Sequence, residues 1–315
     1  LISSEENLMR RGPFRLIDLL VGTFIVLFVS GIVLSKAPAA NEIKMRVKCA
    51  SNLRMIGQAL LLYSNENRGA FPRTMHDKKD ANPKPVWGTP YEANKDLGAV
   101  KDADPFAKDK DAAAKARPAM EDVTAALFLL LRTQDITADV FICPSTQHRK
   151  FDFGGGMHTA QDWTNWPGNA GLLANLSYSV NNPYASPAAV KAGFKWNNTM
   201  APDAPVVADM NPGVDGLLKL TLQSPADEMR KCNSINHNQD GQNVLYGDGH
   251  VEFQNHPFCG MKRDNLYTYG PTGTDHPNTG GDGIVGGANG EADAVLLPTS
   301  TSLGDTNPLL TPEGL

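Results

Sequence analysis

The chain has 315 residues, of which 20% are charged, and a formal net charge of −5. This balance provides no basic surface for nucleic acid, so the sequence excludes nucleic acid as a partner. The 29 glycines and 22 prolines predict many turns and long loops. Beyond an amino-terminal helical region, about 250 residues remain, enough for one large or two small domains.

A mostly apolar run, FRLIDLLVGTFIVLFVSGIVLS, occupies residues 14–35. From Leu16 it contains about 20 residues, which is enough for one helix to cross a bilayer at about 1.5 Å per residue. Arg10 and Arg11 precede the run, and no small-residue cleavage site follows it. The sequence therefore predicts a retained membrane segment, with the bulk of the chain and its cysteines outside the cytoplasm.

The helix is expected to continue to about residue 65 as an amphipathic stem. Apolar residues recur there at spacings of three and four, which predicts one apolar stripe facing a globular head. The stripe consists of Met45, Cys49, Leu53, Ile56, Leu60 and Tyr63. Pro38 should kink or locally melt the helix, and Gly69 and Pro72 should end it.

The remaining residues, 67–315, are expected to form the head. A stretch rich in Lys, Asp, Ala and Pro at 76–117 predicts an exposed loop insertion, and a Gly-rich tail covers 270–315. A buried helix is predicted at 121–132, with Pro118 just before its start. Strands are predicted at 140–145, 176–180, 205–210, 243–246 and 250–253, the last two joined by the turn Gly247-Asp248-Gly249.

Three segments of the chain resemble one family. Residues 14–20, FRLIDLL, are similar to the type IV prepilin amino terminus, in which a basic leader ending in Gly precedes a pattern like F-T-L-I-E-L-L. Residues 46–73 and 236–253 resemble the stem and the hairpin of pseudopilin-like proteins that carry a carboxyl-terminal H-x9-DG processing-associated domain. Two details differ: Pro13 separates Gly12 from Phe14, and ten residues separate His237 from Asp248.

The resemblance implies an α+β, pilin-like fold, in which a long amino-terminal helix packs on an antiparallel β-sheet head with long loops. One half of the helix would be transmembrane and the other half the amphipathic stem. The resemblance divides the chain into a leader-like segment at 1–13, a membrane and stem helix at 14–66, and an extracytoplasmic head at 67–315.

The resemblance also implies a non-enzymatic structural subunit of a type IV pilus-like or type II secretion pseudopilus-like filament. Its partners would be copies of itself, the inner membrane before assembly, a prepilin peptidase and the pilus or secretion assembly machinery. The protein would be anchored in the inner membrane with an extracytoplasmic head, or would lie in an extracellular, cell-surface filament. The alternative is a single-pass, membrane-anchored extracytoplasmic binding protein that does not polymerise.

Five residues of the amino-terminal pattern are assigned to assembly by this resemblance: Phe14, Leu16, Asp18, Leu19 and Leu20. The pilin acid equivalent to Asp18 pairs with the freed amino terminus of a neighbouring subunit and sets the register. Burying an acid inside an apolar membrane span costs free energy, so such an acid is also a candidate for a functional role. The alternative is an acid near the interface that pairs with Arg15, three residues earlier.

The signature hairpin contributes His237, Asp248, Gly249 and His250. No H-E-x-x-H motif and no G-x-S-x-G elbow is present, so we predict no catalytic residue and no enzymatic activity. The favoured interpretation is structural: Asp248 accepts turn N–H groups, and His237 ties the preceding loop to the hairpin. The alternatives are a metal site or an acid–base cluster formed by the two histidines and Asp248.

Four cysteines, at positions 49, 143, 232 and 259, allow up to two disulfides. Cys49 lies on the apolar stripe and Cys143 follows a predicted strand, so their pairing would join stem to head. Cys232 and Cys259 bracket the hairpin. We expect these two pairs, each stabilising the fold by a few kcal/mol. The alternatives are free buried thiols or a zinc site, against which the absence of a C-x-x-C pair counts.

The Gly-rich tail suggests one cofactor, calcium. Asp275, Asp282 and Asp293 place carboxylate oxygens on this segment, and calcium prefers oxygen ligands from flexible loops. The spacing does not fit an EF-hand, and the alternative is a solvated loop. No other cofactor is expected.

Overall fold

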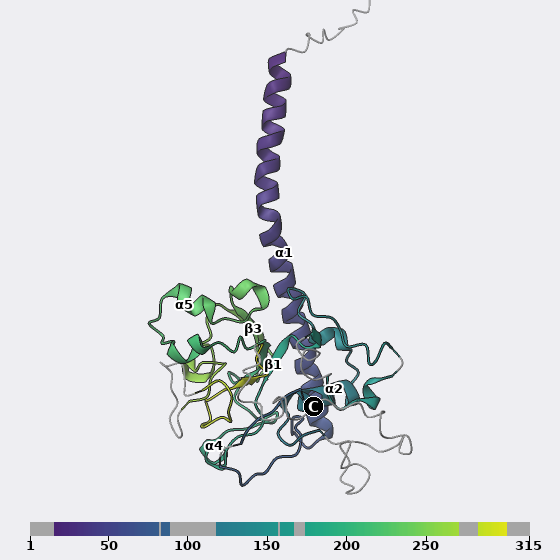
Figure 1. Ribbon diagram of the computed structural model, residues 1–315, viewed down its shortest axis with the longest axis vertical. Helices are drawn as coiled ribbons and strands as arrows, with labels where there is room; N and C mark the ends of the chain where they lie inside the picture. Colours follow the sequence, from purple (N-terminus) through teal and green to yellow (C-terminus); the bar gives the residue numbers. More distant parts are fainter. Residues whose placement is uncertain are drawn as a thin grey trace, which may run out of the picture. The chain divides into compact units, whose positions relative to one another are not determined.

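The computed structural model of the chain describes residues 16–81, 83–88, 118–156, 158–166, 174–270 and 283–300. Two compact units are present, Leu1–Lys44 and Met45–Leu315. Helix α1 (Leu16–Glu66) belongs to both, and we call its residues 45–66 the stem (Figure 1). The expected leader at 1–13, Phe14 and most of the loop at 76–117 lie outside the described residues.

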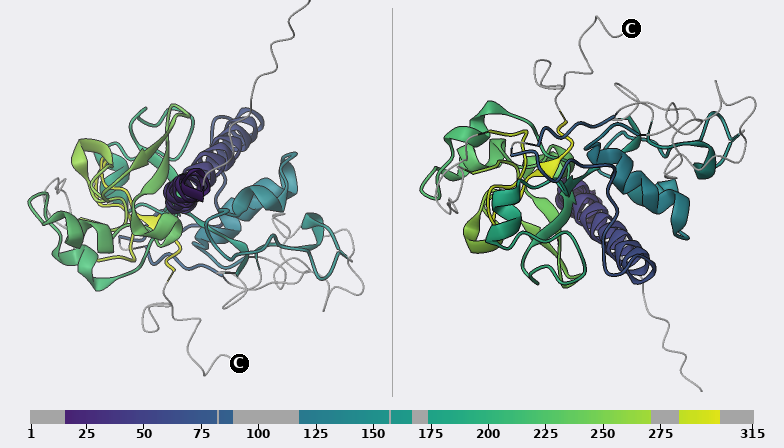
Figure 2. Two further views of the ribbon diagram at one scale, coloured as in Figure 1. Left: turned by 90° about the horizontal axis from the view of Figure 1, so that it is seen from above. Right: turned by 90° about the horizontal axis from the view of Figure 1, so that it is seen from below.

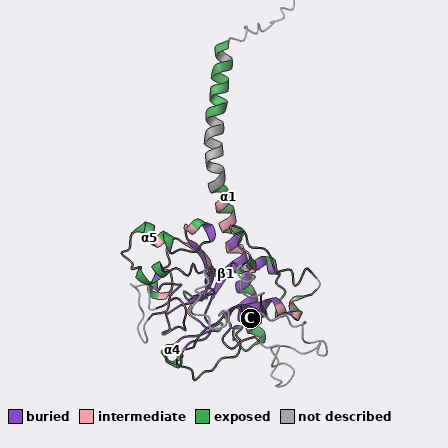
Figure 3. Ribbon diagram, viewed as in Figure 1, coloured by how far each residue is buried: buried purple, intermediate pink, exposed green. Residues whose placement is uncertain are grey.

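In the first unit, α1 exposes large apolar side chains along its first turns (Figure 3). These are Leu16, Ile17, Leu19, Leu20, Val21, Phe24, Ile25, Val26, Leu27 and Phe28. Among the residues that the structure describes, no helix is both long and apolar enough to cross a bilayer. The expected local melting at Pro38 is wrong, because α1 runs through it without interruption, while a kink there stays a prediction. A proline removes one helix hydrogen bond, and the bonds before and after it can still hold the helical path.

The second unit contains a five-stranded antiparallel sheet with the order β4-β3-β2-β1-β5. Its strands are β1 (Tyr178–Asn181), β2 (Pro205–Asp209), β3 (Gln242–Tyr246), β4 (Val251–Gln254) and β5 (Leu296–Leu297). The longer helices of this unit are α2 (Val123–Thr133), α4 (Pro187–Ala192) and α5 (Ala226–Lys231). Short 3-10 turns are η2 (Ala138–Phe141), η3 (Ala160–Asp162), η4 (Asp215–Lys219), η5 (Asn236–Gln239) and η6 (Met261–Arg263). The expected α+β class is confirmed.

Four of the five predicted strands are confirmed within one or two residues as β1, β2, β3 and β4. The strand expected at 140–145 is wrong. That segment forms η2, in which Val140 N donates to Thr137 O and Ile142 N donates to Asp139 O. Its apolar residues are buried without pairing in the sheet, because these bonds within the turn, and one from Ser177 N to Phe141 O at 3.0 Å, satisfy its backbone groups.

Helix α2 confirms the helix predicted at 121–132. Its start is set by Asp122, whose side chain accepts a hydrogen bond from Ala125 N at 2.8 Å, rather than by Pro118. The carboxylate of Asp122 also accepts from Thr124 Oγ1 and Asn165 Nδ2. Nine of its eleven residues are buried, so this capping carboxylate holds the first turn of a core helix.

The stem packs on the sheet through the predicted apolar stripe. Cys49, Leu53, Ile56 and Leu60 are buried, while Met45 and Tyr63 at the two ends are partly buried. Gly57 lies directly against β3, because a Cβ added there would lie 3.1 Å from Leu245 Cδ1. Figure 2 shows the stem flanked by α2 on one side and by the sheet on the other.

Candidate functional site

Four side chains that bind transition metals in other proteins meet in the core of the second unit. They are Cys49 from the stem, Cys143 just after η2, Asp209 at the end of β2 and His237 in η5. All four are buried, and one potential ligand atom from each lies within 4.8 Å of the other three. This cluster, which we call the thiol–imidazole cluster, joins four segments that are distant in the sequence.

His237 is held in a defined orientation. Its Nδ1 lies 2.8 Å from Ser145 Oγ, and its Nε2 lies 3.2 Å from Asn243 Nδ2. An amide nitrogen can only donate, so Nε2 carries a lone pair and Nδ1 carries the hydrogen that Ser145 accepts. The Nε2 atom lies 3.5 Å from Cys143 Sγ and 3.4 Å from Asp209 Oδ2. The imidazole therefore presents an acceptor nitrogen to the thiol–imidazole cluster.

The backbone at His237 is strained. His237, Asn238 and Gln239 have φ of 57°, 57° and 61°, in the left-handed region that few residues other than glycine adopt. Three such residues in a row cost free energy that the surrounding contacts must offset. The contacts of the His237 side chain with Ser145 and Asn243 are part of that offset.

Asp209 accepts hydrogen bonds at both carboxylate oxygens. Its Oδ1 accepts from Cys49 Sγ at 2.9 Å and from Asn236 Nδ2 at 3.0 Å. Its Oδ2 accepts from the backbone N of Asn243 at 2.6 Å and from Asn243 Nδ2 at 3.2 Å. These donors fix the carboxylate and supply the polar partners that a fully buried charge requires.

Neither expected disulfide is formed in this structure, in which all four cysteines are free thiols. The Cys49 thiol instead donates to Asp209 Oδ1 at 2.9 Å, and its sulfur lies within 4.8 Å of the Cys143 sulfur. Hydrogen bonding by Cys49 lowers the pKa of the Cys143 thiol, whereas burial, above all, raises the pKa of Cys49. Cys232 and Cys259 lie outside the thiol–imidazole cluster. Cys232 packs against Gly216, and Cys259 Sγ contacts Pro257 O. The sequence thus placed Cys49 and Cys143 together, and the structure holds them as neighbouring thiols.

The signature hairpin is divided between two places. Asp248 lies in the turn between β3 and β4, where it accepts a hydrogen bond from His250 N at 3.0 Å and lies 2.5 Å from His250 Nδ1. The backbone N–H of His250 is the main cause that lowers the pKa of Asp248. Gly249 has φ of 89°, which the tight turn requires. These side chains are half-exposed, whereas His237 is buried in the thiol–imidazole cluster.

The other predicted site residues lie elsewhere. Leu16, Leu19 and Leu20 are exposed on α1, while Phe14 and the side chain of Asp18 lie outside the described residues. Among the tail acids, Asp275 and Asp282 also lie outside them. Asp293 is buried and accepts from Gly270 N at 3.1 Å and Asn289 N at 2.6 Å, so backbone groups occupy its oxygens. Calcium binding by the tail stays a prediction.

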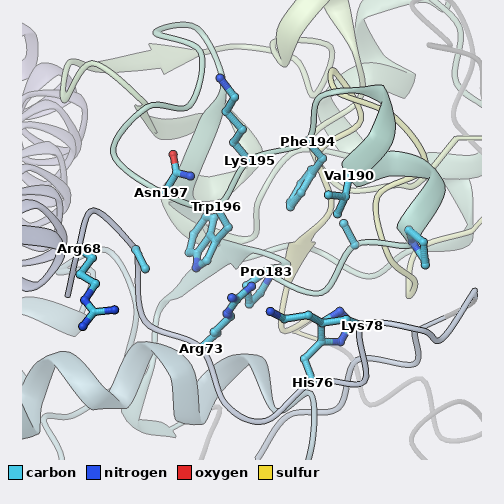
Figure 4. A pocket seen from close by; sticks show the side chains of 13 residues that line it. Arg68, Arg73, His76, Lys78, Pro183, Val190, Phe194, Lys195, Trp196 and Asn197 are labelled. Atoms are coloured by element: carbon cyan, nitrogen blue, oxygen red, sulfur yellow. The ribbon is translucent and has the colours of Figure 1, made fainter.

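A pocket of about 470 Å³ opens on the second unit, near the end of the stem. Figure 4 shows the cations Arg68, Arg73, Lys78 and Lys195 around the aromatic rings of Trp196 and Phe194. His76 lines the same pocket, and its Nδ1 lies 2.9 Å from Glu121 Oε1. The pocket therefore combines an apolar floor with a positive rim, a combination suited to an anionic ligand with an apolar part.

These features define an α+β protein with an exposed apolar helix and a buried cluster of two thiols, an imidazole and a carboxylate. No family model, curated protein or solved structure matches the chain. The sequence missed one member of the cluster, Asp209. Its only signal was a carboxylate directly after the apolar run of β2, a position where a charged side chain is unexpected unless it has partners.

Proposed function

We propose that the chain is a structural subunit of a type IV pilus-like or pseudopilus-like filament, assembled through the apolar first turns of α1. The observation that carries this proposal is the exposure of ten large apolar side chains within residues 16–28. No other described element exposes a comparable set.

These side chains surround the helix. Successive residues of an α-helix are about 100° apart, so ten apolar residues among thirteen leave no polar face. Exposed apolar surface costs about 25 cal/mol per Å², and a helix that is apolar all round is normally covered. Copies of the same helix would cover it in a filament core, and lipid would cover it before assembly.

The sequence supports this proposal independently of exposure. Residues 14–20 resemble a prepilin amino terminus, and residues 46–73 resemble a pseudopilin-like stem. The stem packed on an antiparallel sheet agrees with the head that the resemblance implies. Its partners would then be copies of the chain, the inner membrane, a prepilin peptidase and an assembly machinery.

Substituting Phe24 by aspartate is expected to abolish assembly, because the Phe24 side chain is 69% exposed and lies amid the apolar turns. A charge buried between helices would cost several kcal/mol per subunit contact. The measurement is sedimentation of sheared surface material together with negative-stain electron microscopy.

A matched control carries the same added charge on the head. Gln223 is exposed there, so Gln223→Asp should assemble as the wild type does. Filaments of normal length from Phe24→Asp would refute assembly through this helix. Absence of filaments from the wild-type protein expressed with an assembly machinery would refute it as well.

The cation-rich pocket favours a second candidate function, that of a membrane-anchored extracytoplasmic binding protein that does not polymerise. Arg68, Arg73, Lys78 and Lys195 would attract an anionic ligand, and Trp196 would contact its apolar part. In that case the apolar turns of α1 would contact lipid only, and photocrosslinking from position 24 would give crosslinks to lipid and no oligomers.

A further inference from the structure

We propose that Cys49, Cys143, Asp209 and His237 form a structural binding site for a zinc-type transition metal ion, which fastens the stem to the head. The proposal goes beyond the filament function and holds whether or not the chain polymerises. It rests on the convergence of four buried ligand atoms from four separate segments.

The distances suit a tetrahedral ion. With metal–sulfur bonds of about 2.3 Å and metal–nitrogen and metal–oxygen bonds of about 2.1 Å, tetrahedral geometry places sulfur and nitrogen about 3.6 Å apart, and nitrogen and oxygen about 3.4 Å apart. Cys143 Sγ lies 3.5 Å from His237 Nε2, and His237 Nε2 lies 3.4 Å from Asp209 Oδ2. The Cys49 Sγ to Asp209 Oδ1 distance of 2.9 Å is that of a thiol hydrogen bond, which the ion would replace.

The donor types select the class of metal. Two thiolates and an imidazole favour Zn²⁺ over Ca²⁺ or Mg²⁺, which prefer oxygen ligands alone. A closed set of four protein ligands is typical of a structural rather than a catalytic zinc site. Binding would release the two thiol protons to solvent. The carboxylate and the acceptor Nε2 of His237 would bind without losing a proton, leaving the site with one net negative charge.

Groups around the ligands match those of known metal sites. Ser145 Oγ accepts from His237 Nδ1, which orients the ring with Nε2 toward the cluster. Asn236 and Asn243 donate to the Asp209 carboxylate. The Tyr178 hydroxyl lies 3.3 Å from Cys49 Sγ, where it can donate to a thiolate. These donors are placed to offset the net negative charge of the loaded site.

The site would also explain the strained backbone. Metal coordination contributes binding free energy only to the folded state, so it can hold His237 at a left-handed φ that ordinary packing would not favour. It would fix the stem at Cys49 to β2 at Asp209 and to η5 at His237.

The test is zinc binding by the purified full-length chain. The protein is reduced, treated with a chelator and titrated with Zn²⁺ alone, and Co²⁺ is used in parallel as a spectroscopic probe. We expect one Zn²⁺ per chain, a higher unfolding temperature with Zn²⁺, and the thiolate-to-cobalt charge-transfer and intense d–d bands of tetrahedral Co²⁺. Cys143→Ser should lose about half of the charge-transfer intensity, since one of two thiolates remains, and bind Zn²⁺ at least about 10-fold more weakly.

The control is Cys259→Ser, which removes a thiol outside the cluster and should leave both signals unchanged. If Cys143→Ser fails to fold, Ser145→Ala tests the same site, since it removes only the partner of His237 Nδ1 and should weaken Zn²⁺ binding by about 10-fold. Wild-type protein that binds no Zn²⁺, equal binding by Cys143→Ser, or a Cys49–Cys143 disulfide in the native protein under non-reducing peptide mapping would each overturn the proposal.

Discussion

Replacing Asp209 by alanine is expected to lower the free energy of unfolding by about 4 kcal/mol. The Asp209 side chain is fully buried, and its two oxygens accept from Cys49, Asn236 and Asn243. Alanine would remove the acceptor of the Asn243 backbone N–H and of the Cys49 thiol, and one acceptor each from the side chains of Asn236 and Asn243, which keep Ser177 O and His237 Nε2. Each buried donor left unsatisfied costs about 1–3 kcal/mol. The prediction holds for metal-free protein, because it depends only on these hydrogen bonds. Urea denaturation of the reduced, chelated protein measures the change.

The matched control for this substitution is Asp203→Ala. Asp203 precedes the same strand and is exposed, so its removal should change the free energy of unfolding by less than about 0.5 kcal/mol. A loss below about 1 kcal/mol for Asp209→Ala would contradict the role of this carboxylate as the common acceptor of the cluster.

Gly57→Leu is expected to destabilise the second unit by about 3 kcal/mol. A Cβ added at Gly57 would lie 3.1 and 3.2 Å from the two methyl carbons of Leu245, so a full leucine side chain would force the stem away from β3. Overpacking of this kind forces side chains from their preferred rotamers and shifts the backbone. The unfolding midpoint in urea, with its slope, gives the free-energy change.

The same substitution at another helical glycine provides the control. At Gly22, also on α1, a new Cβ would meet nothing within 4 Å, so Gly22→Leu should not lower the stability of the second unit. Equal stability of Gly57→Leu and the wild type would show that Gly57 does not pack closely against Leu245 of β3.

The sequence predicted the elements that a local pattern of apolar residues marks along the chain. The stem stripe follows a helical period, and its four central residues are buried. Helix α2 comes from an apolar run, and strands β1 to β4 come from short segments with apolar residues bounded by turn residues, and all of them form as expected. Strand β5 has only two residues and pairs with the distant β1, so no local pattern could identify it.

The differences in the second unit share one cause, which is long-range packing. Residues 138–141 have the apolar content of a buried strand, but they form a 3-10 turn whose apolar side chains are buried in the core. Cys49 and Cys143 were expected to pair with each other alone, because the approach of Asp209 and His237 could not be read from their separations in the chain. His237 and Asp248 belong to one motif in sequence, yet the first is buried and the second half-exposed.

The measurement that tests the filament proposal most directly is photocrosslinking from position 24 in cells. Phe24 is replaced by a photoreactive phenylalanine analogue, which keeps an apolar ring at an exposed site of α1. We predict a ladder of covalent oligomers, with crosslinked peptides from residues 16–28 of a second copy of the chain. Crosslinks to lipid alone, with no oligomer, would contradict assembly through this helix and favour the anchored binding protein.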